Sequence, residues 1–301
     1  MIYVMGHKAP DTDSVIAAIA EAEFLRQKGI DAEPVIQGPV SPETQWVLDK
    51  FELDTPEIMT SVAGKEIVLV DTSEPSQLPD DINEAKITSI VDHHNLGGIK
   101  TAETLHITIR PFGATCTIIA GQFQEKDFGI PARLAGAMVC AILSDTVMFK
   151  SPTTEGKDRR TVEKLSIMAH VSPKELGMEM FRVKSNIDNE TVQNLLARDT
   201  KDYECSGKKI TVATLELVDI KPIKKRLPEI KAEMKKNHAG GRSIILLIVD
   251  IIKEGALMVS YTDNDKKIEK MFMGDWKDHE AYIPGIISRK RQVVPILNRH
   301  Y

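Results

Sequence analysis

Four short segments in the first half of the chain carry aspartate and histidine residues at a spacing that suits a pair of divalent metal ions. They are residues 6–14, 70–72, 91–94 and 143–145. Three of them end or follow an apolar run that is typical of a buried strand. Carboxylates seldom gather at the ends of buried strands unless a cation neutralises them. Because two close metal ions can activate water and bind a phosphoryl group, the four segments predict that chemistry.

The first segment places His7, Asp11 and Asp13 on a loop that leads into a helix. Pro10 stiffens this loop and disfavours helical structure before it. Asp11 and Asp13 can therefore face two neighbouring ions, and Ser14 can cap the helix. An Asp followed by a Ser is a common helix cap in proteins without a metal site. The additional His7 makes a cap alone a less favourable explanation than a metal site.

The next two segments supply a bridging carboxylate and a pair of imidazoles. Asp71 follows the apolar run 67–70, where its two oxygens could bridge two ions. Asp92, His93 and His94 are consecutive and give the most specific local signal. An aspartate directly before two histidines can orient an imidazole ring.

The fourth segment carries one carboxylate in apolar surroundings. Asp145 lies near the end of residues 134–149, which we expect to form a long apolar helix. A buried aspartate there needs a partner, and a metal is favoured over a backbone cap because of the other motifs. A mixed set of carboxylates and imidazoles favours Mn²⁺ or Co²⁺ over Ca²⁺ or structural Zn²⁺.

The apolar pattern around these segments predicts an α/β fold, with a parallel sheet covered by helices on both faces. Strands are expected at residues 2–5, 66–70 and 88–91, and helices at residues 14–28, 44–51 and 116–124. This alternation of strand and helix is typical of parallel sheets. Ligands bind beyond the carboxyl ends of the strands in such sheets, and His7, Asp71 and Asp92 all follow predicted strands.

Residues 187–301 are predicted to form a second, smaller α/β domain. The polar stretch at residues 184–189 is the expected linker, so that the first domain comprises residues 1–186. Residues 1–186 carry 18 basic and 27 acidic side chains, whereas residues 187–301 carry 21 and 17. This asymmetry suits metals in one domain and an anion in the other, although chance variation is the simpler explanation of these numbers alone.

A basic segment near the C-terminus supplies candidate phosphate ligands. Arg289 and Lys290 lie between the apolar pairs 286–287 and 293–294, which implies a rigid and partly buried frame. Arg binds phosphate oxygens through two N–H groups, and Lys binds them as a point charge. The alternative is that this basic segment is solvated surface, as most basic segments are. Lys201 is a weaker candidate phosphate ligand, which alone would be interpreted as a surface residue.

Composition excludes several classes of protein. No run approaches the ~18 apolar residues that a membrane span needs, and the predicted strand at residues 2–5 leaves no room for a signal peptide. Three cysteines without a CxxC pair indicate reduced thiols and a cytoplasmic protein. Aromatic residues form 5% of the chain and none lies near Arg289, which disfavours nucleic-acid binding.

The combination of motifs resembles the family II inorganic pyrophosphatases, the manganese-dependent type within the DHH phosphoesterase superfamily. The resemblance spans nearly the whole chain, from residues 6–14 through residues 92–94 and 144–145 to residues 288–295. It implies a soluble enzyme with two Mn²⁺ ions, a C-terminal domain that closes over the site, and a homodimer formed through the N-terminal domain. We expect hydrolysis of pyrophosphate to two phosphates by a hydroxide that bridges the metals, with further Mg²⁺ arriving with the substrate.

The resemblance also implies a role for each motif residue. Two ligand sets that share Asp71 would each hold one ion: His7, Asp11 and Asp71 for the first, and Asp13, Asp71, His93 and Asp145 for the second. Four further side chains would contact the substrate phosphates: His94, Lys201, Arg289 and Lys290. Asp92 would orient a neighbouring imidazole.

The second motif departs from the family pattern. Members often have Asp-His-Asn-Glu where this chain has Asp71, Thr72, Ser73 and Glu74. Asp71 should sustain catalysis, whereas Thr72 is expected to change metal affinity or preference. No long insertion separates the second and third motifs, where regulated members carry nucleotide-binding domains, so we expect no regulation by adenine nucleotides.

Two other classes of function stay open at this point. An exopolyphosphatase or a short-oligonucleotide phosphodiesterase of the DHH superfamily would use the same metal site. A polyphosphatase would differ from a pyrophosphatase only in the length of its substrate pocket. A metal- or anion-binding protein without catalysis would usually lack some of the ligands, whereas all six ligand positions are filled in this chain.

Overall fold

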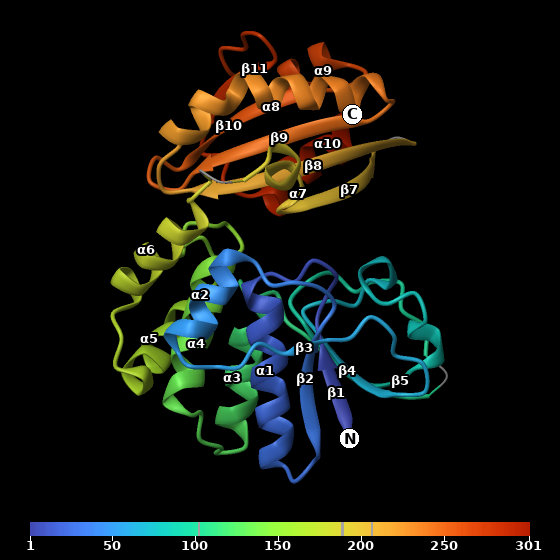
Figure 1. Ribbon diagram of the computed structural model, residues 1–301, viewed down its shortest axis with the longest axis vertical. Helices are drawn as coiled ribbons and strands as arrows, with labels where there is room; N and C mark the ends of the chain where they lie inside the picture. The colour runs from blue at the N-terminus through green and yellow to red at the C-terminus, as the bar shows by residue number, and fades with distance from the viewer. Residues whose placement is uncertain (102, 188–189, 206) are drawn as a thin grey trace. The chain divides into compact units, whose positions relative to one another are not determined.

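The computed structural model describes residues 1–101, 103–187, 190–205 and 207–301. The chain divides into two compact units, Met1–Met180 and Phe181–Tyr301, which Figure 1 colours from blue to red along the sequence. The linker expected at residues 184–189 falls in the second unit, and its residues 188 and 189 lie outside the described residues.

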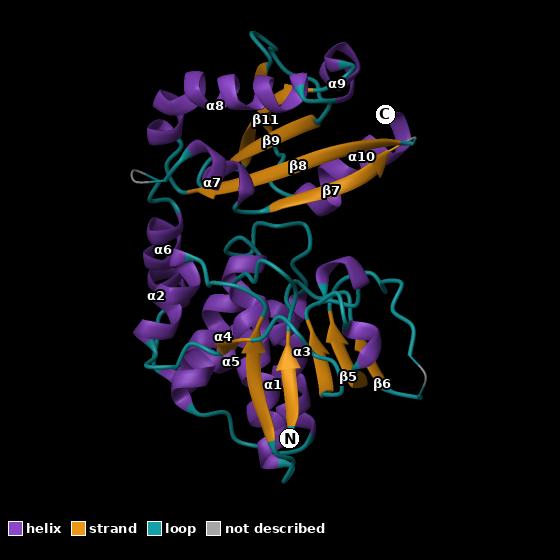
Figure 2. Cartoon of the chain, turned by 45° about the vertical axis from the view of Figure 1, so that its right-hand side comes forward, coloured by secondary structure: helices purple, strands orange, loops and turns teal. Residues whose placement is uncertain are grey.

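The first unit is built on a six-stranded sheet with the order β3-β2-β1-β4-β5-β6, whose strands run parallel (Figure 2). Its strands are β1 (Ile2–Met5), β2 (Ala32–Ile36), β3 (Glu57–Ile58), β4 (Glu66–Val70), β5 (Lys86–Asp92) and β6 (His106–Ile109). The direction of strand addition reverses between β1 and β4. Ligands of open α/β sheets bind beyond the carboxyl ends of the strands at such a point.

Helices pack on one face of this sheet, some of them directly and others through neighbouring helices, and short 3₁₀ helices lie on the other face. The helices are α1 (Thr12–Gln27), α2 (Pro42–Lys50), α3 (Thr115–Glu125), α4 (Ala132–Asp145), α5 (Gly156–Ala169) and α6 (Pro173–Lys184). Helix α1 packs on β1 and β2, and α3 and α4 pack against α1, so α1 is buried around most of its circumference. On the other face, Leu78 and Ile82, beside the 3₁₀ helices η1 (Pro75–Gln77) and η2 (Ile82–Glu84), join Met5 and Leu69 in one apolar cluster.

Helix α4 ends earlier than the sequence predicts. The expected helix at residues 134–149 stops at Asp145, and the backbone then turns left-handed at Val147, Met148 and Phe149, with φ of 49°, 53° and 65°. The Thr146 hydroxyl accepts a hydrogen bond from the Phe149 amide at 3.3 Å. Asp145 therefore lies at the end of the helix, where its carboxylate can leave the apolar core.

The second unit contains a mixed five-stranded sheet with the order β11-β10-β9-β8-β7. Its elements are α7 (Val192–Ala197), β7 (Thr200–Cys205), β8 (Lys208–Leu217), α8 (Lys221–Ala239), β9 (Ser243–Asp250), β10 (Gly255–Tyr261), α9 (Asp265–Met271), β11 (Glu280–Pro284), η3 (Arg289–Val293) and α10 (Val294–His300). Strands β8 and β9 are parallel and the other neighbours antiparallel. Ile230 and Met234 of α8 pack against Leu246 and Ile248 of β9 in one core.

These two units confirm the predicted fold class, an α/β parallel-sheet domain followed by a second α/β domain. Among the described helices, none combines the length and apolar character that crossing a membrane requires. The predicted boundary at residue 186 and the roles given to the two domains stay predictions.

Candidate metal centre

Two clusters of ligand atoms share Asp71 beyond the carboxyl ends of β1, β4 and β5. Each cluster contains atoms that all lie within 4.8 Å of one another: His7, Asp11 and Asp71 form one, and Asp13, Asp71, His93 and Asp145 form the other. The structure thus brings together the members of both ligand sets that the family resemblance implies. A third group at the same place joins Asp71 and His93 with His94.

The distances within the clusters suit a metal ion between the ligand atoms. His7 Nε2 lies 3.4 Å from both Asp11 Oδ2 and Asp71 Oδ2. His93 Nε2 lies 3.4 Å from both Asp71 Oδ1 and Asp145 Oδ2. Two atoms that are each about 2.1 Å from one ion lie roughly 3.0 to 3.4 Å apart, whereas N–H···O hydrogen bonds are usually shorter than about 3.2 Å.

The two candidate histidine ligands are oriented by backbone carbonyls. His7 Nδ1 lies 2.7 Å from the Lys8 oxygen, and His93 Nδ1 lies 3.0 Å from the Phe112 oxygen. Since a carbonyl only accepts, each Nδ1 carries a proton, and in the neutral ring Nε2 then holds the lone pair that a metal ion would bind. Histidine ligands of metals usually donate their other N–H in this way.

Asp71 is turned toward the clusters by an unusual backbone conformation. It has a φ of 59°, in the left-handed region, directly after β4, and its amide donates to the Val91 oxygen at 2.9 Å. Oδ1 of its carboxylate faces His93 and Oδ2 faces His7. Each oxygen of Asp71 therefore belongs to a different cluster, as a bridging ligand requires.

The loop before α1 is fixed by Asp11 and Ser14. The prediction that Ser14 caps α1 is wrong, because Asp11 is the N-cap and its Oδ1 accepts from the Ser14 amide at 2.9 Å. The Ser14 hydroxyl instead accepts from the His7 amide at 3.2 Å. It packs so closely that a Cβ on Gly6 would come within 1.9 Å of it. Glycine at position 6 thus lets the loop place His7 beside Asp11.

The first turn of α3 holds the carboxylate of Asp13, which the sequence analysis did not foresee. The amides of Thr115 and Cys116 donate to Asp13 Oδ2 and Oδ1 at 2.6 and 3.1 Å. The Thr115 hydroxyl donates to Asp71 Oδ1 at 2.8 Å. Ala114, the N-cap of α3, offers no side-chain acceptor, so Asp13 satisfies the free amides of this helix and its charge favours the positive end of the helix dipole.

Asp158 anchors the start of α3 to α5. Its carboxylate is fully buried and accepts from the amides of Gly113 and Glu155 at 2.9 and 2.7 Å and from the Thr117 hydroxyl at 2.6 Å. A Cβ on Gly113 would lie 2.5 Å from the Thr146 methyl group. The loop that presents Thr115 is therefore tightly constrained.

The carboxylates form a site with excess negative charge. Burial and the neighbouring Asp71 raise the pKa of Asp13 well above its ordinary value. Burial lowers the pKa of His7, but the carboxylates of Asp11 and Asp71 outweigh it and raise that pKa overall. Among the described residues, His7 Nε2 and Asp71 Oδ2 are buried with no hydrogen-bond partner. Divalent cations would relieve both the charge and the unsatisfied atoms, so this donor set fits a pair of metal ions.

Asp92 orients His94, which is a candidate substrate ligand. Asp92 Oδ1 accepts from both the amide and Nδ1 of His94 at 2.9 Å. Its Oδ2 accepts from the Ser73 hydroxyl at 3.2 Å, and that hydroxyl accepts from the Gly97 amide at 2.8 Å. Thr72, where the family often has histidine, is buried and its hydroxyl accepts from the Glu74 amide at 3.2 Å. Ser73 thus links the second and third motifs.

The cationic candidates lie in the second unit. Arg289 begins η3, and its guanidinium donates to the Asp199 and Val212 oxygens at 2.8 and 3.1 Å and to Asp199 Oδ1 at 2.7 Å. Burial lowers the pKa of Arg289, but Asp199 outweighs it and raises that pKa overall. Lys290 follows in the same turn, and Lys201 lies on β7 opposite Val212. Arg289 is thus held in place by its own domain.

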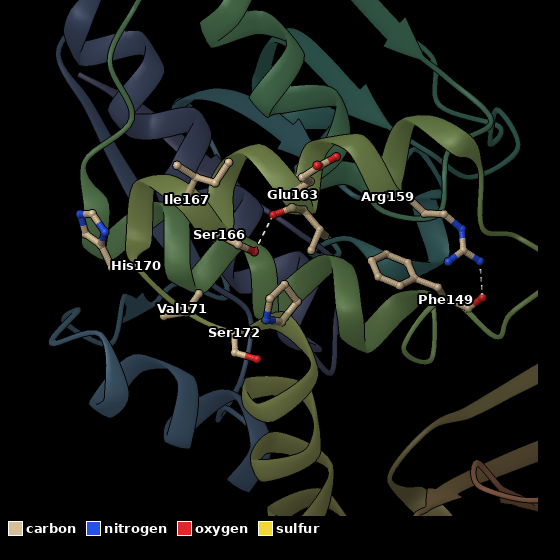
Figure 3. Close-up of a pocket in the computed structure, with 10 residues that line it drawn as sticks. Phe149, Arg159, Glu163, Ser166, Ile167, His170, Val171 and Ser172 are labelled. Atoms are coloured by element: carbon tan, nitrogen blue, oxygen red, sulfur yellow. Dashed lines mark hydrogen bonds between the residues drawn. The ribbon is translucent and has the colours of Figure 1, made fainter.

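A cavity lies in another part of the first unit, away from the candidate ligands. It measures about 690 Å³ and lies beside α5 and the turn that follows α4 (Figure 3). Phe149 and Arg159 line it, and Arg159 donates to the Phe149 oxygen at 3.0 Å. None of its lining residues is a candidate metal or phosphate ligand. The predicted chemistry therefore does not involve this cavity.

Comparison with known proteins gives the same assignment along the whole chain. Residues 1–142 match the DHH family, N-terminal domain, and residues 178–300 match the DHHA2 domain. A manganese-dependent inorganic pyrophosphatase of Methanothrix thermoacetophila is 40% identical over 301 residues, which cover 98% of this chain and 97% of that protein. One of Bacillus subtilis is 35% identical over 300 residues, with coverage of 98% and 97%.

Solved structures agree with the sequence comparison. A putative family II inorganic pyrophosphatase of Methanococcus jannaschii has a TM-score of 0.88 at 36% identity, over 100% of this chain and 99% of that one. An exopolyphosphatase-related protein of Bacteroides fragilis has a TM-score of 0.52 at 12% identity, over 99% and 91%, and shares the fold alone. The identity over the full length and the matching domains show that this chain belongs to the manganese-dependent, family II inorganic pyrophosphatases.

Proposed function

We propose that this protein hydrolyses inorganic pyrophosphate to two phosphate ions. The observation that carries the proposal is the pair of ligand clusters that share Asp71. Such a pair suits phosphoryl transfer to water better than a structural site, which would be closed around one ion. The proteins of Methanothrix thermoacetophila and Bacillus subtilis that bear this activity in their names are 40% and 35% identical to the chain.

Two Mn²⁺ ions are the proposed resident cofactors, with Co²⁺ as an alternative. The first would be held by His7, Asp11 and Asp71, and the second by Asp13, Asp71, His93 and Asp145. When bound, two such ions lower the pKa of a water molecule and withdraw charge from a phosphoryl group. Further Mg²⁺ is proposed to accompany the substrate.

The side chains around the metals would bind and orient the substrate. The four aspartates offset the charge of two divalent ions, so the charge of pyrophosphate needs other partners. His94 donates Nδ1–H to Asp92, and in the protonated ring its Nε2–H would donate to a phosphate oxygen. Three of the five N–H groups of Arg289 bind Asp199 and Val212, and we propose that the others, with Lys290 and Lys201, bind phosphate.

The domain roles follow from this assignment. Residues 1–186 would bind the metals and supply His94, and residues 187–301 would supply the cationic side chains that bind the substrate. A second copy of the chain is the proposed partner, without nucleic acid or membrane. The edge strand β6 supports a homodimer, because among the described strands it pairs with β5 alone, and Ile107 is 48% exposed. The three buried cysteines are free thiols, which supports a cytoplasmic location.

The decisive experiment compares three substrates. Metal-free protein is loaded with Mn²⁺ and assayed in Mg²⁺ for phosphate release from pyrophosphate, tripolyphosphate and a short oligonucleotide. We expect a preference for pyrophosphate, and the Asp71→Asn variant should lose release from all substrates because both ions lose their shared ligand. Faster turnover of the longer phosphates would support the exopolyphosphatase alternative and overturn the proposal.

A further inference from the structure

A carboxylate that bridges two ions has to be fixed in rotation. The χ2 torsion of aspartate, about the bond that carries the carboxylate, is broad, so a bridging carboxylate can rotate away from both ions. In Asp71, Oδ1 faces His93 and Oδ2 faces His7, each at 3.4 Å. A rotation of the carboxylate would move both oxygens out of these positions at once. Any group that fixes Asp71 therefore acts on both clusters.

The Thr115 hydroxyl is placed to fix this rotation. It donates to Asp71 Oδ1 at 2.8 Å, and Thr115 is completely buried. The same residue donates its amide to Asp13 Oδ2 at 2.6 Å. One residue at the start of α3 thus holds a carboxylate of the second cluster and the carboxylate shared by both. Each oxygen keeps a second lone pair for a metal.

The position of Thr115 is fixed by contacts of the residues on either side of it. The preceding Gly113 donates its amide to Asp158 at 2.9 Å, and the following Cys116 amide donates to Asp13 at 3.1 Å. The Phe112 oxygen accepts from His93 Nδ1. The start of α3 is thus a rigid frame that reaches three candidate ligands.

We propose that Thr115 is a positioning residue that orients the bridging carboxylate and thereby sets the affinity of the site for both ions. This inference rests on the proposed pair of metal ions. Removing the hydroxyl leaves Asp71 Oδ1 without its donor and lets the carboxylate rotate. Loss of a group that orients a ligand typically weakens metal binding by about 10- to 100-fold, and we expect that loss here.

Thr117 offers a matched control on the same helix. It is also completely buried, but its hydroxyl donates to Asp158 at 2.6 Å instead of to a candidate ligand. The experiment compares Thr115→Val, Thr115→Ser and Thr117→Val in the full-length, metal-free protein. Mn²⁺ is titrated against a chelating indicator to give the dissociation constants, and circular dichroism and Tm report folding.

Thr115→Val should raise the Kd of Mn²⁺ about 10- to 100-fold, whereas Thr115→Ser, which keeps the hydroxyl, should stay within about threefold of wild type. Thr117→Val should lower Tm but leave Kd within about threefold. The proposal is overturned if Thr115→Val binds Mn²⁺ like wild type, or if Thr115→Ser or Thr117→Val loses as much affinity. If the valine variant does not fold, Thr115→Ala is judged by the same criteria.

The readout separates this proposal from the proposed function. A wild-type protein that binds Mn²⁺ without releasing phosphate from pyrophosphate fails the function, and the affinities of the Thr115 variants still decide the positioning role. A wild-type protein that cleaves pyrophosphate, together with an unaltered Kd in Thr115→Val, refutes only the positioning role.

Discussion

Glu21 allows a quantitative test of how α1 is buried. It is 3% exposed, and among the described residues its Oε2 has no hydrogen-bond partner. It lies about 12 Å along the helix from Asp13, so its effect is separate from the metal ligands. Burial raises the pKa of Glu21 from 4.5 to about 8, with Lys28 as an opposing influence.

The sign of the pH effect follows from this shift. Between about pH 4.5 and 8 the native protein holds a proton on Glu21 that the unfolded chain has released, so the free energy of unfolding falls as pH rises. Glu21→Gln mimics the neutral form and cannot ionise. At about 1.4 kcal/mol per pKa unit, the stability of the variant relative to wild type should grow by about 3 kcal/mol between pH 5 and 7.5.

Urea unfolding in metal-free buffer measures this difference, because metal affinity itself depends on pH. Trp46 and Trp276 are the two tryptophans, one in each unit, so a Trp276→Phe background makes fluorescence report on the first unit. Glu23→Gln is the control, since Glu23 is 26% exposed and pairs with Arg26 at 3.4 Å, a contact worth less than about 1 kcal/mol. The reasoning is refuted if the difference in the free energy of unfolding between Glu21→Gln and wild type is the same at pH 5 and at pH 7.5.

Three further measurements address the site and its frame. Asp158→Ala should lower the free energy of unfolding by about 3 to 5 kcal/mol, because two buried donors and one partly buried donor lose their acceptor; a loss below about 1 kcal/mol in urea unfolding contradicts this. Ser73→Ala should raise KM for pyrophosphate roughly tenfold, because Asp92 holds His94 less firmly, and steady-state kinetics test it. Mn²⁺ at 100 times its Kd should stabilise the protein by about 2.7 kcal/mol for each bound ion, and an unchanged urea midpoint would contradict a site that exists only in the folded state.

The sequence predicts β1 and β4 well but does not predict β2, which lies next to one edge of the sheet, or β6, which forms the other edge. Strands β1 and β4 have the predicted bounds, because buried parallel strands are continuous apolar runs. Strand β2 carries Glu33 and Pro34, and β6 begins with an exposed His106, so neither shows that pattern. These strands are recognised only through their pairing with β1 and β5.

The candidate ligands can be identified from the sequence, but the residues that hydrogen-bond to them and fix their positions cannot. His7, Asp71 and His93 stand out because they follow or end apolar runs. The contact between Thr115 and Asp13 joins residues 102 positions apart, and no periodicity encodes it. The local signal is that Ala114, directly before the helix, has no side chain that could accept from the first amides of the helix. These amides therefore need an acceptor from another part of the chain.

The candidate ligands also lie where the backbone and the charges are least favourable for folding. Asp71 is left-handed, and Asp145 lies two residues before the left-handed run that begins at Val147; each left-handed residue costs about 1 to 2 kcal/mol. Strain of this kind persists only where the surrounding contacts impose it, and Thr115 and the Val91 oxygen supply such contacts to Asp71. The buried carboxylates repel one another in addition. Since divalent ions remove that repulsion, metal binding and the stability of the first unit should be coupled, and the metal-free protein should be the less stable state.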